Sequence, residues 1–268
     1  MEKLFNNILV PFALWENADG AVQKAIEMAN QIQCHVHILL FMQAHVGEES
    51  SGIAHFKKTI HQRYQPRLHP SLSLTICSRE GLPEKLIVDY YRKHGIDLIL
   101  LTRTAGAFWK TGRTSFPVNV NRLIKKVQCP LLNITLEPGA SGIKNIVLPV
   151  GDVLPVRKLL FATYLAKLSR STIHLVSAGG RTSSLSGEGM ESLQRSYRLL
   201  RENTSLSVEC RTMPGENLAD VALSYAKRIQ ADLILIGPGK ESHLSGFLNA
   251  LRSRFLFDAS LIPVMTVS

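Results

Sequence analysis

The sequence predicts an α/β protein made of two tandem, doubly wound parallel sheets of five strands each. The chain contains an internal repeat, because Asn7–Pro11 (NILVP) recurs as Asn145–Pro149 (NIVLP). Short apolar runs alternate with longer segments of helical spacing, which is typical of β-α units that build a parallel sheet. The 268 residues are also enough for two domains of ordinary size.

The repeat extends along the whole chain and divides it into two copies. Its further matches follow in the same order in both copies: Gly81 with Gly215, Asp97–Leu101 with Asp232–Ile236, and Cys129–Leu132 with Ile262–Met265. We therefore predict one domain over residues 1–138 and a second over residues 139–268. The Pro/Gly/Ser-rich segment Glu137–Gly142 is the expected linker.

Each copy is expected to hold five strands separated by four helices. Ala18–Gln31 has an apolar stripe at helical spacing, and Pro83–His94 begins with a proline where its missing N–H costs little. The predicted strands are Leu4–Pro11, Cys34–Phe41, Leu72–Cys77, Asp97–Thr102 and Leu131–Thr135, then Asn145–Pro149, Thr172–Ser177, Leu206–Cys210, Asp232–Gly237 and Pro263–Val267. This element order is Rossmann-like or flavodoxin-like.

Composition indicates a soluble globular protein. Hydrophobic residues make up 45% and charged residues 19%, which is too apolar for a disordered chain. The apolar stretch Ile8–Trp15 contains Pro11 and is shorter than the ~20 residues of a membrane span, and no signal-peptide pattern follows it. We expect a cytoplasmic protein without a membrane partner. The four cysteines are widely spaced and are expected to be reduced thiols.

The net charge of +10 would attract anionic partners such as nucleic acid, acidic lipid or phosphorylated ligands. The excess is divided equally between the two copies, so no basic tail or arm exists. Arg122, Lys125 and Lys126 are interpreted as a solvated helix face. Nucleic acid is therefore not an expected partner, and that hypothesis depends on net charge alone.

Ligands of doubly wound sheets bind beyond the carboxyl ends of the strands where the winding reverses, here the first and fourth strands of each copy. In the second copy, Gly237–Lys240 (GPGK) follows the fourth strand. A phosphate could meet its backbone amides and Lys240, or the segment could be only a tight turn that needs glycine. Asp152, after the first strand, could orient a ribose or cap the helix near Pro155.

Other signals remain open to two interpretations. Thr102–Ser115 offers cations, hydroxyls and glycines for an anion, or is a solvated loop in which Phe108 and Trp109 pack. His35, His37 and His45 could suggest a metal, but no acidic or cysteine cluster accompanies them and no metal site is assigned. No nucleophile, base and orienting acid occur at a recognisable spacing, so no catalytic residue is assigned.

Taken together, the repeated segments resemble a tandem universal stress protein. They are the opening NILVP and NIVLP strands, the Gly81 and Gly215 turns, the two DLIL strands and the closing CPLL and IPVM segments. The resemblance implies an adenine nucleotide alpha hydrolase-like fold and a binding or regulatory role in the stress response. It also implies a dimer: an intrachain pseudo-dimer, a homo-oligomer, or both, paired through the closing strands.

One branch of that family binds ATP through G-x-x-G, nine residues and then G-[ST] after the fourth strand. The second copy begins with Gly237 but has Lys240, Ala250 and Leu251 at the later motif positions, although Gly239 is adjacent to the second. In the first copy the motif would begin at Thr102, and none of it remains.

The resemblance therefore implies a non-enzymatic module with degenerate nucleotide-binding loops, and no cofactor is assigned with certainty. The alternative is an ATP-binding switch or slow ATPase that uses the second copy. An adenine nucleotide or another phosphorylated small molecule is the candidate ligand. The candidate binding residues are Pro149, Gly151, Asp152, Val176, Gly237, Gly239, Lys240 and Gly246.

Overall fold

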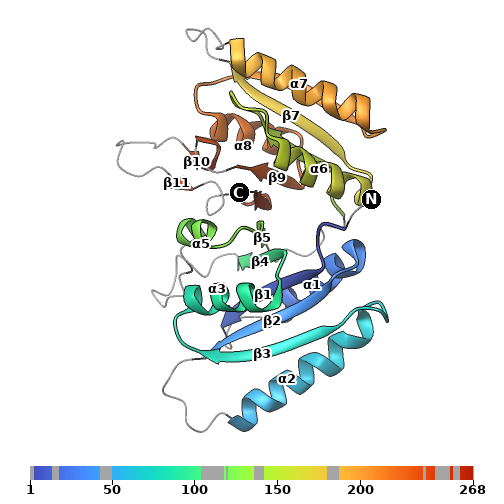
Figure 1. Cartoon of the computed structure of the whole chain (residues 1–268), viewed down its shortest axis with the longest axis vertical. Helices are drawn as coiled ribbons and strands as arrows, with labels where there is room; N and C mark the ends of the chain where they lie inside the picture. Colours follow the sequence, from blue (N-terminus) through green and yellow to red (C-terminus); the bar gives the residue numbers. More distant parts are fainter. Residues whose placement is uncertain are drawn as a thin grey trace. The chain divides into compact units, whose positions relative to one another are not determined.

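The computed structural model of the chain describes residues 3–13, 18–42, 50–103, 118, 120–135, 142–179, 187–237, 240–244, 254–255 and 260–267. The chain divides into two compact units, Met1–Glu137 and Pro138–Ser268. Each unit contains a parallel sheet flanked by helices (Figure 1). The predicted α/β class with doubly wound parallel sheets is confirmed.

The first unit holds a sheet in the order β3-β2-β1-β4-β5, in which neighbouring strands are parallel. The order reverses between β1 and β4. The strands are β1 (Asn7–Ala13), β2 (His35–Met42), β3 (Leu74–Glu80), β4 (Leu98–Arg103) and β5 (Leu131–Thr135). The described helices are α1 (Ala18–Ile32), α2 (Ser50–Tyr64), the short 3-10 helix η1 (Gln65–Arg67), α3 (Pro83–His94) and α5 (Val120–Lys126).

The second unit repeats this order as β8-β7-β6-β9-β12, so its winding reverses between β6 and β9. Its parallel strands are β6 (Asn145–Pro149), β7 (Thr172–Gly179), β8 (Val208–Pro214), β9 (Leu233–Ile236) and β12 (Val264–Thr266). Its described helices are α6 (Val156–Ser169), α7 (Gly187–Asn203), α8 (Leu218–Arg228) and the 3-10 helix η2 (Lys240–Ser242). A small antiparallel pair, β10 (His243–Leu244) with β11 (Arg254–Phe255), follows η2.

The central strands carry apolar side chains on both faces because helices cover both faces of a doubly wound sheet. All of β9 and most of β6 are buried. At the outside of the sheets, α2 packs against β3, and α7 packs against β7 and β8 (Figure 1). This arrangement leaves the loops at the carboxyl ends of the strands as the place for chemistry.

Some strand boundaries differ from the sequence prediction. The first strand begins at Asn7 rather than Leu4 and continues past Pro11 to Ala13. Pro11 has no N–H, yet the strand continues because β1 remains paired with β2 up to Ala13, whereas its pairing with β4 covers only Ile8 and Leu9. The strand predicted over Leu206–Cys210 is observed as β8 over Val208–Pro214, because its pairing with β7 continues as far as Pro214.

The repeated aspartates lie just before β4 and β9 and join them to the neighbouring central strands. The Asp97 carboxylate accepts hydrogen bonds from the backbone N–H groups of Asn6 and Asn7, at 2.8 and 3.1 Å. Asp232 accepts in the same way from Lys144 and Asn145, at 2.7 and 2.9 Å. The aspartates therefore fix the amino ends of the central strands in both units.

Within the described ranges, no helix has both the length and the apolar character needed to cross a bilayer.

Candidate functional site

The candidate site lies in the second unit, where β6 and β9 end side by side. Pro149 is the last residue of β6, and Gly237 follows the last residue of β9. A lysine from α6, Lys158, extends between them with a side chain that is only 5% exposed. Its ammonium group donates a hydrogen bond to the Pro149 carbonyl oxygen at 2.6 Å. A buried positive charge therefore lies where the winding of the sheet reverses, between β6 and β9.

Glu241, on η2, neutralises that charge. Its Oε2 atom forms a hydrogen-bonded ion pair with the Lys158 ammonium group. The same oxygen accepts a hydrogen bond from the Gly237 backbone N–H at 2.8 Å. One carboxylate oxygen therefore connects α6, the end of β9 and η2.

Glu241 lies directly beside the Gly237 backbone. A Cβ atom added at Gly237 would lie 3.4 Å from Glu241 Oε2, which is at the limit of ordinary van der Waals contact. The contact with the carboxylate therefore does not by itself require glycine. The Gly237 N–H would be the first backbone donor of a phosphate-binding loop, and in this structure Glu241 occupies it.

Burial and pairing act on Lys158 in opposite directions. Burial lowers the pKa of the Lys158 ammonium group from its usual range, while the Glu241 charge and hydrogen bond oppose that shift. The desolvation contribution is the larger, so the pKa of Lys158 remains lowered. Without Glu241, only the lowering effect of burial would act on this pKa.

Neither Lys158 nor Glu241 was among the residues predicted from the sequence. The sequence does carry a signal for Lys158, because it lies on the stripe of α6 that buries Ala162, Leu165 and Ala166. A lysine on an apolar stripe needs a buried partner. That partner is 83 residues away in the sequence, so local spacing does not reveal it.

The other predicted residues contribute differently. Val176 is fully buried in β7, and its carbonyl oxygen accepts a hydrogen bond from the backbone N–H of Val150 at 2.8 Å. A Cβ atom on Gly151 would lie 3.5 Å from the side chain of Leu218 on α8. The structure therefore brings Pro149 and Gly237 together through Lys158 and Glu241. Val176 lies beside Pro149 as its partner in the β6–β7 pairing, whereas no described contact connects Gly151 to Lys158 or Glu241.

Asp152 is exposed, and its carbonyl oxygen accepts a hydrogen bond from the Ser192 hydroxyl of α7 at 2.7 Å. The N-cap residue of α6 is Pro155, so Asp152 does not occupy the capping position considered above. The backbone of Lys240 begins η2, and nothing is described of its side chain. Gly239 and Gly246 lie outside the described residues.

The first unit lacks the lysine. Gly20 of α1 stands where the repeat places Lys158, nine residues after Pro11 as Lys158 is after Pro149. Most of the Thr102–Ser115 segment, considered above as an anion site, lies outside the described residues. The buried ion pair is accordingly described for the second unit alone.

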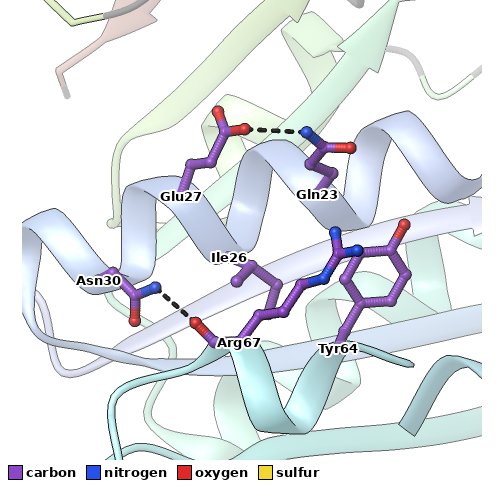
Figure 2. A pocket seen from close by; sticks show the side chains of 6 residues that line it. All are labelled: Gln23, Ile26, Glu27, Asn30, Tyr64 and Arg67. Carbon is purple, nitrogen blue, oxygen red and sulfur yellow. Dashed lines mark hydrogen bonds between the residues drawn. The ribbon is translucent and has the colours of Figure 1, made fainter. Parts of the chain in front are cut away.

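A hollow of about 240 Å³ in the first unit lies between α1 and the α2–η1 segment (Figure 2). Its polar groups already contact one another: the Asn30 amide donates to the Arg67 carbonyl oxygen at 2.8 Å, and the Gln23 amide donates to Glu27 at 3.1 Å. The Arg67 guanidinium lies over the ring of Tyr64, 5.2 Å from its centre. The lining residues are Gln23, Ile26, Glu27, Asn30, Tyr64 and Arg67.

The histidines considered for metal binding take part in hydrogen bonds to other side chains. His35 pairs with the Ser73 hydroxyl at 2.9 Å. His37 bonds to the Tyr90 hydroxyl at 3.1 Å and to the Asn7 side chain at 3.2 Å. His45 lies outside the described residues, and the part that the structure describes contains no group of three or more His, Cys, Asp or Glu residues suited to a metal ion.

Solved structures with this arrangement cover nearly the whole chain. A universal stress protein from Archaeoglobus fulgidus DSM 4304 is 14% identical, with a TM-score of 0.70 over 98% of this chain and 96% of that one. A provisionally assigned universal stress protein from Pseudomonas aeruginosa UCBPP-PA14 is 17% identical, with a TM-score of 0.60 over 99% and 94%. The cytoplasmic domain of a prokaryotic cation chloride cotransporter is 12% identical, with a TM-score of 0.52 over 98% and 95%.

No protein-family model matches the sequence, and no curated protein matches it. At the identities of the structural matches, the likeness concerns the fold, so the site must be interpreted from its own residues. The resemblance inferred from the repeated strands and turns is confirmed at that level. The chain has the universal stress protein fold.

Proposed function

We propose that the protein is a non-enzymatic binding or regulatory module of the universal stress protein type, which acts in the cytoplasm during the stress response. In its resting form the second unit would hold no ATP at the reversal between β6 and β9. The observation that carries this proposal is the occupation of the Gly237 N–H by the Glu241 carboxylate.

Electrostatics supports this proposal. An ATP phosphate placed at Gly237 would have to share the backbone donor and the Lys158 ammonium group with a carboxylate of the same charge. Like charges at hydrogen-bond distance repel strongly where water is excluded. The ion pair with Glu241 also removes the attraction that a lone Lys158 would offer to a phosphate. ATP binding would therefore first require displacement of Glu241.

The non-enzymatic part of the proposal is supported by the surroundings of Ser242, which directly follows Glu241. The Ser242 hydroxyl and His243 Nδ1 are 2.9 Å apart, a distance that suits a nucleophile and its base. However, Ser242 is only 3% exposed, so a substrate carbonyl would not reach its hydroxyl in this arrangement. The pair is better explained as part of the packing of η2.

The test is native mass spectrometry of the freshly purified protein, followed by thermal denaturation with added ATP. We expect no stoichiometric adenine nucleotide, no increase in melting temperature with ATP and no phosphate release above background. One bound ATP per chain, or an increase abolished by Lys240→Ala, would contradict the proposal and favour the ATP-binding switch or slow ATPase.

The same mass spectrum tests the assembly. Pairing of the units as a pseudo-dimer, and further homo-oligomerisation, stay predictions from the resemblance. A single species at a multiple of the 29.7 kDa chain mass is the expected result. A monomer at all concentrations would contradict homo-oligomerisation.

A further inference from the structure

The outward face of α6, the first helix of the second unit, is apolar. Val153, just before the helix, is 80% exposed, and Val156 and Leu160 within it are 62% and 53% exposed. Val156 and Leu160 are four residues apart and therefore lie side by side on the helix surface. The opposite face of α6 packs against β6 and β7. Apolar side chains thus occur on both faces of the helix, although the sheet covers only one of them.

The internal repeat provides a comparison for this face. In the first unit, α1 exposes Gln23, Glu27 and Gln31 at helical spacing, while its Val22 and Ile26 are buried. The first helix of a unit can therefore cover its sheet with a polar outward face. The apolar outward face of α6 is a property of the second unit, and exposed apolar patches of this kind mark protein or membrane contacts.

The charges beside the apolar side chains are positive. No Asp or Glu occurs between Asp152 and Glu188 in the sequence. Arg157 and Lys167 are exposed on α6, and Arg170 is exposed at its carboxyl end. A second copy placed on this face would bring these cations together, because a two-fold contact joins the same patch of both copies. The face therefore favours an anionic partner.

The chemistry of the apolar side chains distinguishes between anionic partners. Protein interfaces are centred on aromatic side chains and arginine that fill pockets of the partner. The exposed side chains of this face are aliphatic and lie on the outward, convex side of a helix. Helices that lie in a membrane interface combine such an apolar face with Lys and Arg beside it.

We propose that the outward face of α6 is a peripheral docking surface for an anionic lipid bilayer. Val153, Val156 and Leu160 would enter the boundary between the headgroups and the acyl chains, and the Lys and Arg side chains beside them would contact lipid phosphates. The inference goes beyond the proposed function. A peripheral contact of this kind needs no membrane-spanning helix.

The experiment measures co-flotation of the full chain with vesicles of phosphatidylcholine, with or without phosphatidylglycerol. We expect binding only to vesicles that contain phosphatidylglycerol, and weaker binding as salt is added. Val156→Gln combined with Leu160→Gln gives α6 the kind of side chain that α1 exposes, and should weaken binding by about tenfold or more. Leu82 of the first unit is 75% exposed, so Leu82→Gln is the control and should leave the affinity unchanged.

A second pair of variants tests the cations. Lys167→Gln combined with Arg170→Gln should also weaken binding by about tenfold or more. Lys57→Gln combined with Lys58→Gln on α2 removes the same net charge from the first unit and should weaken binding much less. Equal losses in the two double variants would show that net charge alone drives the binding, and would overturn the proposal.

The remaining outcomes also decide the proposal. Failure of the unsubstituted protein to bind phosphatidylglycerol vesicles would overturn it, as would unchanged affinity in the Val156→Gln, Leu160→Gln variant. Binding of an acidic amphipathic peptide but not of vesicles would assign the face to a protein partner instead. A dimer that this variant dissociates, without vesicle binding, would assign it to a second copy. The substituted side chains are exposed, so melting temperatures should stay unchanged and verify folding.

Discussion

Lys158 introduces a charge on a helix face that otherwise carries apolar side chains. A buried ion pair adds little net stability over an apolar pair of similar volume, but removing one partner leaves the other as an unpaired buried charge. The two unpaired charges are not equivalent here. A Glu241 carboxylate left alone is 17% exposed and keeps the Gly237 N–H. A Lys158 ammonium group left alone is 5% exposed and keeps only a neutral partner, the Pro149 carbonyl oxygen.

This asymmetry predicts the order of stability among the variants. Glu241→Ala should lower the free energy of unfolding by about 3 kcal/mol, because it leaves the deeper charge unpaired. Lys158→Met should cost less, about 1–2 kcal/mol, and the double variant should be more stable than the sum of the two losses implies. Chemical denaturation of the single variants and the double variant measures these differences. A strictly additive cycle would show that the two side chains do not interact.

The repeat supplies a matched pair of glycines in the turns before α3 and α8. Both have positive φ, +135° at Gly81 and +149° at Gly215. A Cβ atom at Gly81 would lie 3.6 Å from Leu86, but one at Gly215 would lie 2.5 Å from Val221 Cγ2. An alanine at either site would therefore have a strained backbone, but only an alanine at Gly215 would also clash with a neighbouring side chain.

Accordingly, Gly215→Ala should destabilise the protein by about 1–3 kcal/mol more than Gly81→Ala, the usual cost of overpacking. Denaturation of both variants under identical conditions tests this. Equal losses would mean that Val221 moves aside freely, which its burial on α8 argues against.

Among the elements, each of the two sheets has the same strand order and its own copy of a histidine network. His37 in β2 joins Tyr90 of α3 to Asn7 of β1. In the second unit, His174 of β7 joins Tyr225 of α8 to Asn145 of β6, with both separations 3.1 Å. Each ring therefore ties a helix to two strands near the amino end of the sheet.

These networks predict a loss of stability in mild acid. Burial, with the nearby charges of His94 and His35, lowers the pKa of His37 to about 4, below its ordinary 6.5. Below pH 6.5 the unfolded chain binds a proton that the folded chain excludes, so the free energy of unfolding should fall between pH 6.5 and pH 4. Urea denaturation across this range measures the slope.

The contribution of His37 can be separated from that of its counterpart. His37→Gln should make the slope shallower, and His174→Gln should change it less. The reason is that burial and the Arg211 charge lower the pKa of His174 too, but the Glu209 carboxylate, 3.7 Å from its Nδ1, opposes that shift by more than Arg211 adds to it. An unchanged slope in His37→Gln would contradict a neutral, half-buried His37.

The elements themselves were largely predictable from the sequence, and the site was not. Strand order follows from repeated β-α units, since such connections have a fixed handedness. The aspartates before β4 and β9 recur because they cap neighbouring strands. Strand ends such as that of β8 were missed because they depend on pairing with a neighbour rather than on local composition.

The site was missed for a related reason. Motif spacing directed attention to Lys240 and the glycines after β9. In the structure the Gly237 N–H donates to Glu241, and Glu241 in turn pairs with Lys158. The distant pair becomes visible only when α6 and η2 are placed beside each other. Of the predicted residues, Pro149 takes part in this network through its carbonyl oxygen, which every residue has. Gly237 takes part through its backbone N–H, which every residue except proline has.

For the molecule as a whole, the net charge of +10 makes weak attraction to nucleic acid unavoidable at low salt. Because the excess is spread evenly over both copies, we expect no sequence preference. Any affinity for DNA measured at about 50 mM salt should fall by orders of magnitude at about 200 mM, since the binding depends on counterion release. Binding that persists at the higher salt, measured by fluorescence anisotropy, would contradict this expectation.

The proposed function depends on Glu241 holding the Gly237 N–H, which is then not free for a ligand. Amide hydrogen exchange followed residue by residue by NMR measures this directly. We predict slow exchange at Gly237 in the unsubstituted protein and at least tenfold faster exchange in Glu241→Ala. Glu191→Ala, which removes an exposed carboxylate paired with Arg195 on α7, should leave exchange at Gly237 unchanged. Exchange at Gly237 as fast as in an unstructured peptide, in the unsubstituted protein, would contradict the account.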